Sequence, residues 1–327
     1  MRIIQNEFLI IWMLAGLMAS LLAEGNGSFS GAFLRIGLGA RGMAMGNAQV
    51  ATADHGYGAY YNPAALPNLD RKRFSASYSA MSLDRKFNYL GLAVPLKGIA
   101  GVSAGWINSG VGDIRAYNSV GQDVGALDHS LNAFYFSFGA NVIALAQADS
   151  QLMHLRPDLI SIGVTVKFLK ENLDDNEEFN YSGDGLGVDV GVLIRPFRNL
   201  TLGYQIKDVN ARLKSNTDNI FDRGLQLDNP FPVSQRVGFF YRLPVKWAAV
   251  AYDFEWSTKG EEKHHVGVEL KSRLAAARLG YDTNRVTFGG GLLFRAFRKT
   301  YMTLDYAFLS SVVDEGGSHV FSWQFLF

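Results

Sequence analysis

The chain has 327 residues, and its 31 Lys and Arg against 30 Asp and Glu give a net charge of +1. This balance provides no basic surface for nucleic acid, which is excluded as a partner. The absence of cysteine excludes a disulfide scaffold, a thiolate zinc site, a cysteine nucleophile and a lipoprotein anchor. The 35 glycines, the 13% aromatic residues and only 8 prolines favour many paired strands over helices.

Residues 1–23 are predicted to form a signal peptide. Arg2 supplies positive charge, residues 8–19 are almost entirely apolar, and cleavage is expected after Ala23. The alternative is a single membrane-anchoring helix, which the shortness of the apolar run disfavours. No other apolar run approaches 18 residues, so a helical membrane protein is excluded.

Residues 24–70 are expected to form an N-terminal hatch. Glycine recurs here, at Gly31, Gly37, Gly39, Gly42 and Gly46. A segment this rich in glycine does not form a stable domain alone, because ordering it costs much conformational entropy. We therefore expect it to take its order from a surrounding wall, as a plug inside a barrel lumen.

Residues 37–42 spell G-x-G-x-x-G, a pattern found in dinucleotide-binding domains. That use requires a preceding hydrophobic strand, a long following helix and βαβ repeats, and the sequence has none of them. No cofactor is therefore expected. The glycines are predicted instead to allow close backbone packing against the barrel wall.

From Arg73 onward the dominant signal is an alternation with a period of two residues. Val286 and Phe288 point one way, for example, and Thr287 and Gly289 point the other. An even number of strands of about 9 to 11 residues is what a closed bacterial membrane barrel requires. Residues 71–327 are thus predicted to form an all-β, transmembrane, antiparallel barrel of about fourteen strands, near 73–81, 87–95, 99–109, 130–140, 160–170, 184–195, 199–207, 234–242, 247–256, 264–271, 274–282, 285–295, 300–309 and 318–327.

The second face of these strands distinguishes a membrane barrel from a soluble sandwich. It is rich in Gly, Ser, Thr and Ala with isolated charges, which suits a packed or partly hydrated lumen, while the large apolar face is repeated on every strand. A soluble sandwich would instead show its charges to water. The charges predicted to face the lumen are Lys167, Asp189, Arg236, Asp253, Glu255, Glu269, Arg278 and Asp305. Four of these, Asp189, Arg236, Arg278 and Asp305, are expected to pair with Arg35, Arg41 and Asp54 of the hatch.

The predicted connections alternate between short and long, as in barrels with short periplasmic turns and longer external loops. Short turns lie at 95–97, 196–198, 243–246, 272–273 and 296–299, and longer connections at 110–129, 171–183, 208–233, 257–263 and 310–317. Residues 141–159 break the pattern, because a long segment stands where a short turn is due. They indicate a periplasmic insertion or an error in the strand count.

The last strand has its own pattern. Phe321, Trp323, Phe325 and Phe327 alternate with smaller or polar residues and end the chain. This arrangement resembles the signal by which the barrel-assembly machinery recognises its clients. An ordinary hydrophobic last strand is the alternative.

Residues 31–48, GAFLRIGLGARGMAMGNA, followed by YYNPAAL at 60–66, resemble the opening of the PorV/PorQ family, a branch of the FadL-like outer-membrane barrels. The family has a second acid where His55 stands and a glycine where Ala65 stands. The resemblance implies a hatch that contains the triplet Asn62, Pro63 and Ala64. We predict that this triplet turns the chain into the first strand, since Pro63 fixes its own φ and restricts the residue before it. A simple tight turn without a hatch is the alternative.

Other candidate sites are weak. His264 and His265 are adjacent, so they face opposite sides of a strand and cannot chelate one metal, and no metal site is predicted. Acidic residues at 174–178 suggest a solvated outer loop rather than a cation site. No Ser, His and Asp arrangement suits catalysis, and the ionisable lumen residues suggest a salt-bridge network with the hatch. The chain is predicted not to be an enzyme.

Two functions stay open, because one fold serves both. The resemblance implies a barrel associated with type IX secretion, which binds secretion components or cargo at the outer membrane. The alternative is a FadL-like passive transporter of hydrophobic small molecules. The segment 208–233, with several apolar residues, suits either. The other expected partners are outer-membrane lipid, lipopolysaccharide and the barrel-assembly machinery, and the expected location is the bacterial outer membrane.

Overall fold

The computed structural model describes residues 29–52, 55–117, 120–146, 154–174, 180–216, 226–297, 300–311 and 316–327. The predicted signal peptide at 1–23 and Asp54 of the predicted hatch lie outside these ranges. Among the residues described, no helix is long and apolar enough to cross a membrane.

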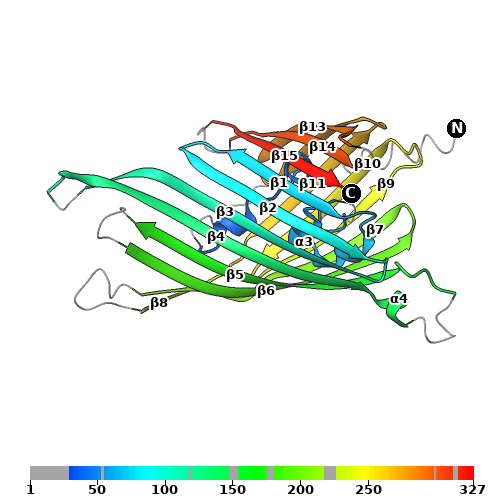
Figure 1. The fold of residues 1–327 in the computed structure, drawn as a ribbon, viewed down its shortest axis with the longest axis horizontal. Coiled ribbons are helices and arrows are strands. Elements are labelled where there is room, and N and C mark those ends of the chain that lie inside the picture. Colours follow the sequence, from blue (N-terminus) through cyan, green and yellow to red (C-terminus); the bar gives the residue numbers. More distant parts are fainter. Residues whose placement is uncertain are drawn as a thin grey trace.

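The strands form one closed antiparallel ring (Figure 1). Apart from β8 and β9, strands that are neighbours in sequence pair with each other, and β1 closes the ring against β15. One position in the ring is interrupted, since β7 pairs with β9 over residues 200–207 and with β8 over residues 212–216. The ring therefore has fourteen positions, which confirms the predicted barrel. Its strands are β1 (Arg73–Ala80), β2 (Arg85–Leu96), β3 (Ala100–Tyr117), β4 (Asp123–Asn141), β5 (Ile160–Asp174), β6 (Asn180–Phe197), β7 (Leu200–Asn216), β8 (Gln226–Pro230), β9 (Ser234–Arg242), β10 (Ala248–Ser257), β11 (Glu262–Lys271), β12 (Ala275–Asp282), β13 (Arg285–Arg295), β14 (Tyr301–Leu309) and β15 (Ser318–Leu326).

The outer surface is apolar and the inner surface is small or polar. Along β1, Phe74 and Tyr78 are about 40% exposed on the outside, while Ser75 and Ser79 are buried inside. Phe136 and Leu279 are more than half exposed on their strands in the same way. This reversal of the pattern of a water-soluble protein is what a barrel surrounded by hydrocarbon needs.

Several predicted outer loops are strands. β3, β4, β6 and β7 have 17 to 19 residues each, whereas β1 and β12 have 8. Most of 110–129, 171–183 and 208–216 therefore continues the ladder, and β3 and β4 project far beyond β13 to β15 (Figure 1). The loop prediction was wrong here because polar and glycine residues obscure the alternation, while backbone pairing still satisfies each N–H and C=O.

The end that holds the chain terminus Phe327 also holds the short turns. The connection between β4 and β5 is the long exception, as predicted, and its described part contains the helix α4 (Val142–Ala146). Figure 1 places α4 at the end opposite the projecting strands. We refer to the end with α4 as the periplasmic end and to the other as the outer end.

Residues 29–52 and 55–70, called the plug below, lie inside the ring and are mostly buried. These residues form four short helices: η2 (Ala32–Arg35), α2 (Ala40–Ala44), α3 (Gly58–Tyr61) and η3 (Pro63–Asn68). Gly37 (φ 106°) follows the end of η2 and Gly39 (φ 75°) caps the start of α2, so left-handed glycines separate these two helices. The predicted fold class, including an N-terminal segment in the lumen, is therefore confirmed.

Candidate functional site

Two of the predicted lumen charges bind the plug backbone directly. Asp253 of β10 accepts hydrogen bonds from the backbone N–H of Gln49 at 2.7 Å and of Val50 at 2.8 Å. Arg236 of β9 donates to the carbonyl oxygen of Asn47 at 2.9 Å and pairs with Glu255. Because charge-assisted bonds to buried backbone groups are strong, these contacts fix the middle of the plug to the wall.

A second network joins the plug to β11, β12 and β14. Glu269 accepts a bidentate pair from Arg41 at 2.9 and 3.0 Å and a further bond from Arg278 at 2.8 Å. Arg278 also donates to Asp305 at 2.6 Å. Arg41 therefore pairs with Glu269, which was not among the wall residues expected to pair with the hatch, and the two carboxylates Glu269 and Asp305 balance the two guanidinium groups.

Two other expected pairings are also different in the structure. Arg35 lies 3.8 Å from Glu261, a residue that the sequence did not single out. Asp189 is bound within the wall, where Lys167 lies 2.6 Å from it and the backbone N–H of Asp208 donates to it at 2.8 Å. The left-handed backbone at Asp208 (φ 62°) turns that N–H toward Asp189. These three residues form a charged cluster within β5, β6 and β7.

The triplet Asn62, Pro63 and Ala64 starts η3 instead of turning the chain into β1, which begins only at Arg73. The Asn62 side chain accepts a bond from Ala64 N–H at 3.0 Å, and this capping bond starts the helix. Its amide nitrogen lies 2.9 to 3.3 Å from three carbonyl oxygens, those of Val50 in the plug and Val192 and Tyr204 in the wall. The prediction that the triplet turns the chain into the first strand was wrong, because the contacts of Asn62 with the wall are not visible in the sequence.

Wall glycines receive the triplet. A Cβ atom at Gly191 would lie 2.0 Å from Asn62 Oδ1, and one at Gly163 would lie 2.4 Å from the Pro63 carbonyl carbon. The plug backbone thus touches the wall backbone on this side. Both glycines belong to the strand face that is rich in Gly, Ser, Thr and Ala and was expected to suit a packed lumen.

The plug glycines have a second role beside the predicted one. Gly37, Gly39 and Gly42 pack against Asn47, Tyr57 and the Tyr61 hydroxyl, which all belong to the plug itself. Gly46 and Gly56 abut the wall, where a Cβ atom would lie 2.3 Å from a β12 carbonyl oxygen and 2.1 Å from Ser75 Oγ, respectively. The glycines therefore both fold the plug onto itself and fit it to the barrel.

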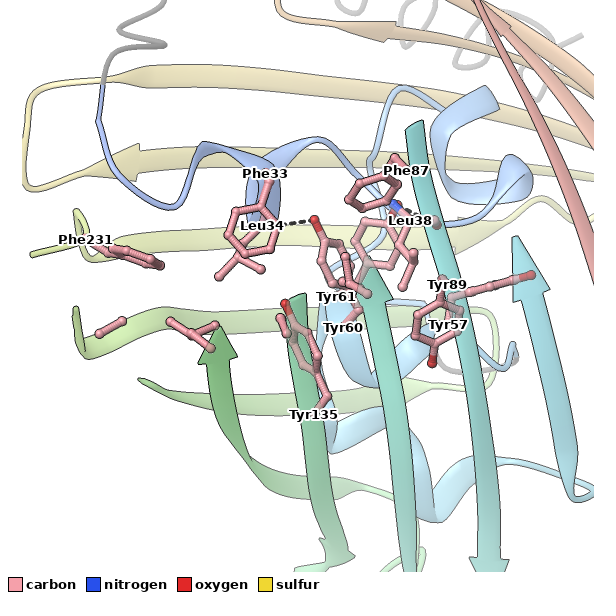
Figure 2. Close-up of a cluster of buried hydrophobic side chains, with 14 of the residues drawn as sticks. Phe33, Leu34, Leu38, Tyr57, Tyr60, Tyr61, Phe87, Tyr89, Tyr135 and Phe231 are labelled. Carbon is pink, nitrogen blue, oxygen red and sulfur yellow. Dashed lines mark hydrogen bonds between the residues drawn. The ribbon is translucent and has the colours of Figure 1, made fainter. Parts of the chain in front are cut away.

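An aromatic cluster fills the lumen at the outer end of the plug (Figure 2). The plug contributes Tyr60 and Tyr61, whose rings meet edge to face at 4.9 Å, and the Tyr60 hydroxyl donates to Leu34 O at 2.6 Å. The Tyr135 hydroxyl has no hydrogen-bond partner among the described residues. The labelled members are Phe33, Leu34, Leu38, Tyr57, Tyr60, Tyr61, Phe87, Tyr89, Tyr135 and Phe231. The sequence analysis missed this cluster, because inward aromatics are hidden among outward ones.

Lys207 lies beside the cluster and is only 5% exposed. Its ammonium group lies 3.9 Å from the centroid of the Tyr60 ring and 3.4 Å from Leu34 O. In the described part of the chain no carboxylate lies at salt-bridge distance from it. A buried cation held by a ring and a carbonyl is a polar group at the edge of an otherwise apolar site.

The periplasmic end of the lumen contains a cavity of about 320 Å³. Five cationic side chains line it, against the two acids Asp70 and Asp305. The cations are Arg41, Arg73, Lys271, Arg273 and Arg278. Along the barrel axis, therefore, an aromatic cluster, the plug and a cationic cavity follow one another.

The last strand places its aromatics outside and its polar residues inside. Phe321 is 41% exposed and Phe327 is 50% exposed, and Trp323 and Phe325 lie on the same face of β15 as Phe321. Ser322 and Gln324 face the plug, where they accept hydrogen bonds from Ala40 N–H at 2.7 Å and Gly56 N–H at 2.8 Å. The role of the terminal aromatics in assembly stays a prediction.

The histidine pair divides as predicted. His264 bonds to the Tyr252 hydroxyl at 2.8 Å on the outer face, and His265 faces inward to Gly46 O at 2.9 Å and Asp282 at 2.9 Å. Among the described residues, no group of His, Cys, Asp and Glu is arranged to hold a metal ion. Of the acidic run at 174–178, only residue 174 lies within the described part.

No protein-family model and no curated protein sequence matches this chain. Solved structures do resemble it. The monoaromatic hydrocarbon channel CymD has a TM-score of 0.59 at 11% identity, over 89% of this chain and 96% of CymD. The toluene transporter TodX of Pseudomonas putida has a TM-score of 0.58 at 15% sequence identity, and the match covers 88% of this chain and 97% of TodX. A FadL homologue of Pseudomonas aeruginosa has a TM-score of 0.57 at 12% sequence identity, and the match covers 88% of this chain and 96% of the homologue. The chain therefore has the FadL-like barrel fold of bacterial outer-membrane proteins, and two of these neighbours are named as a channel and a transporter.

Proposed function

We propose that this chain is a passive conduit for hydrophobic small molecules across the outer membrane. The observation that carries the proposal is the aromatic cluster between the outer end of the plug and the wall. Aromatic and aliphatic side chains that gather around one polar group are typical of small-molecule sites. The neighbours named as a hydrocarbon channel and a toluene transporter support the same substrate class.

A molecule that enters from the outer end meets this cluster first. It replaces contacts between plug residues such as Phe33 and wall residues such as Tyr135, which are apolar and have no preferred direction. A carboxylate or hydroxyl on the molecule has Lys207 and the unpartnered Tyr135 hydroxyl within the same site. The plug then shifts and admits the molecule to the periplasmic cavity.

The secretion-associated function of the PorV/PorQ resemblance has less support. It needs an exposed protein-binding surface on the outer connections, and residues 217–225 of the segment considered for it lie outside the described residues. The structural neighbours carry names of small-molecule channels. We therefore retain transport as the proposal.

Uptake by cells that lack their own hydrophobic channel tests it. Cells that produce the chain are expected to accumulate labelled toluene or a labelled long-chain fatty acid faster than cells with an empty vector. Tyr135→Ser is expected to reduce this uptake severalfold, whereas the matched Tyr135→Phe keeps the ring and most of the uptake. Uptake equal to that of the empty vector, or equal permeation by sugars of similar mass, would overturn the proposal.

A further inference from the structure

An apolar groove runs along the lipid-facing surface of β12 to β15. It has a volume of about 490 Å³, and its sides are formed by Leu292, Leu304, Tyr306, Phe321 and Trp323. The groove is deep because the residues at its base, Ala275, Ala276 and Gly290, are small. A Cβ atom at Gly290 would meet only Ala276 O, at 3.4 Å, so the space above this glycine is open.

The groove and the cationic periplasmic cavity adjoin. Both are lined by Ala275, Ala276, Gly291, Leu292 and Asp305, where β12 and β13 meet near the turn at 272–274. The apolar groove on the outside of the barrel and the cavity lined by five cations and two acids thus share one stretch of wall. The protein as a whole has a net charge of only +1, so this concentration of positive charge is local.

Three cations at the mouth of the cavity have donors left over for a ligand among the residues described. Lys271 and Arg273 are exposed on the turn between β11 and β12, and in the described part of the chain no carboxylate lies at salt-bridge distance from either. Arg73 binds Asp70 through Nη2 at 2.6 Å, but its buried Nε has no hydrogen-bond partner among the described residues. These groups are suited to the oxygens of an anionic ligand.

We propose that the groove and the cavity together bind one anionic phospholipid of the periplasmic leaflet. Its phosphate lies at Lys271 and Arg273 in the mouth of the cavity, and an acyl chain lies in the groove over Gly290. The depth is suitable, because Tyr306 stands five residues beyond the periplasmic start of β14 at Tyr301, a rise of roughly 15 Å. This is about half the thickness of the hydrocarbon core, the length of one leaflet. The inference does not depend on the proposed transport function.

Two variants separate the head and the tail of the lipid. The double variant Lys271→Gln, Arg273→Gln removes the charges, and Gly290→Leu fills the groove without a backbone contact closer than an ordinary one. The matched control is Lys97→Gln, Lys246→Gln, which removes the same charge from two other exposed periplasmic turns. Heat-modifiable migration on gels confirms that each variant is folded before binding is measured.

Binding is measured by native mass spectrometry of the full chain in detergent with added dioleoylphosphatidylglycerol. The wild type is expected to retain one lipid, and dioleoylphosphatidylcholine is expected to bind at least about tenfold more weakly. The head variant and Gly290→Leu are each expected to weaken retention by about tenfold, and the control is expected to leave it unchanged.

Three results would overturn the proposal. Equal loss in the head variant and the control would show a diffuse charge effect. Equal retention of phosphatidylcholine would show that the anion is not recognised. Binding of glycerol phosphate as strong as that of the lipid, with no effect of Gly290→Leu, would show a site for soluble anions only.

Discussion

The plug is held in two different ways on its two sides. Toward β9 to β15, buried charged side chains hold it, such as Asp253 on the N–H of Gln49 and Glu269 on Arg41, beside close approach at Gly267 and Gly280. Toward β2 to β7, it is held by the neutral amide of Asn62, by close approach at Gly163 and Gly191 and by apolar contact of aromatic rings. A hydrophobic ligand can replace the second kind of contact but not the first. The difference indicates that the side toward β9 to β15, the polar side, keeps the plug attached to the wall. The side toward β2 to β7, the packed side, can separate from it.

The largest expected effect comes from removing the plug altogether. Without residues 31–60 the barrel keeps its closed ladder, because β1 pairs with β15 independently of the plug. We expect an inserted barrel whose conductance in planar bilayers is about tenfold or more above that of the intact chain. A truncated barrel that conducts no better would show that the segment does not close the lumen.

Breaking the anchor is expected to have the next largest effect. Glu269→Gln leaves the Arg41 and Arg278 guanidinium groups side by side without their shared carboxylate. Breaking a buried ion pair by removing one partner costs about 3 to 5 kcal/mol. Conductance is expected to fluctuate and the plug to become open to trypsin. Glu262→Gln, an exposed position on the same strand, is the control and is expected to behave like the wild type.

A milder change tests the packed side. Gly191→Ala forces a Cβ atom against Asn62 Oδ1, and overpacking of this kind costs about 1 to 3 kcal/mol. We expect higher basal leak without loss of the anchored state, measured as conductance and trypsin resistance. Gly290→Ala, on the outer surface, serves as the control. If Gly191→Ala loosens the plug as much as Glu269→Gln does, the two sides are equivalent and the comparison fails.

The smallest effect is expected for a single neutral bond on the polar side. Ser322→Ala removes the acceptor for Ala40 N–H. We expect it to lower the free energy of unfolding by about 1 to 3 kcal/mol, because a buried donor loses its partner. The midpoint of urea-induced exposure of the plug should fall slightly, while conductance stays unchanged. A rise in conductance equal to that of Glu269→Gln would mean that the charges have no special role.

The barrel was predictable because alternation is a local pattern. Each strand near the expected bounds exists, and inward polar residues such as Asp253 and Arg236 face the plug as predicted. The extended halves of β3 to β7 were not predictable, because Gly110, Gly112 and their polar neighbours interrupt the alternation. Whether such segments pair depends on strands far away in sequence.

The candidate site was less predictable. The sequence singled out Asn62, Pro63 and Ala64 by resemblance but not the carbonyl groups that Asn62 binds. It placed Arg41 among the charges that pair with the wall but did not assign Glu269 as the partner. The aromatic cluster combines Tyr60 and Tyr135, which are 75 positions apart, and no single strand pattern reveals such a meeting.

The bond between Ala40 and Ser322 spans 282 positions of the chain, and that between Gly56 and Gln324 spans 268. The plug is the first part of the described chain to be synthesised, yet its partners on β15 are the last. Contacts of such high sequence separation form late, since the intervening chain must be ordered first. The plug therefore has no complete set of partners until the ring closes between β1 and β15, and its protection from protease reports that the final step of folding has taken place.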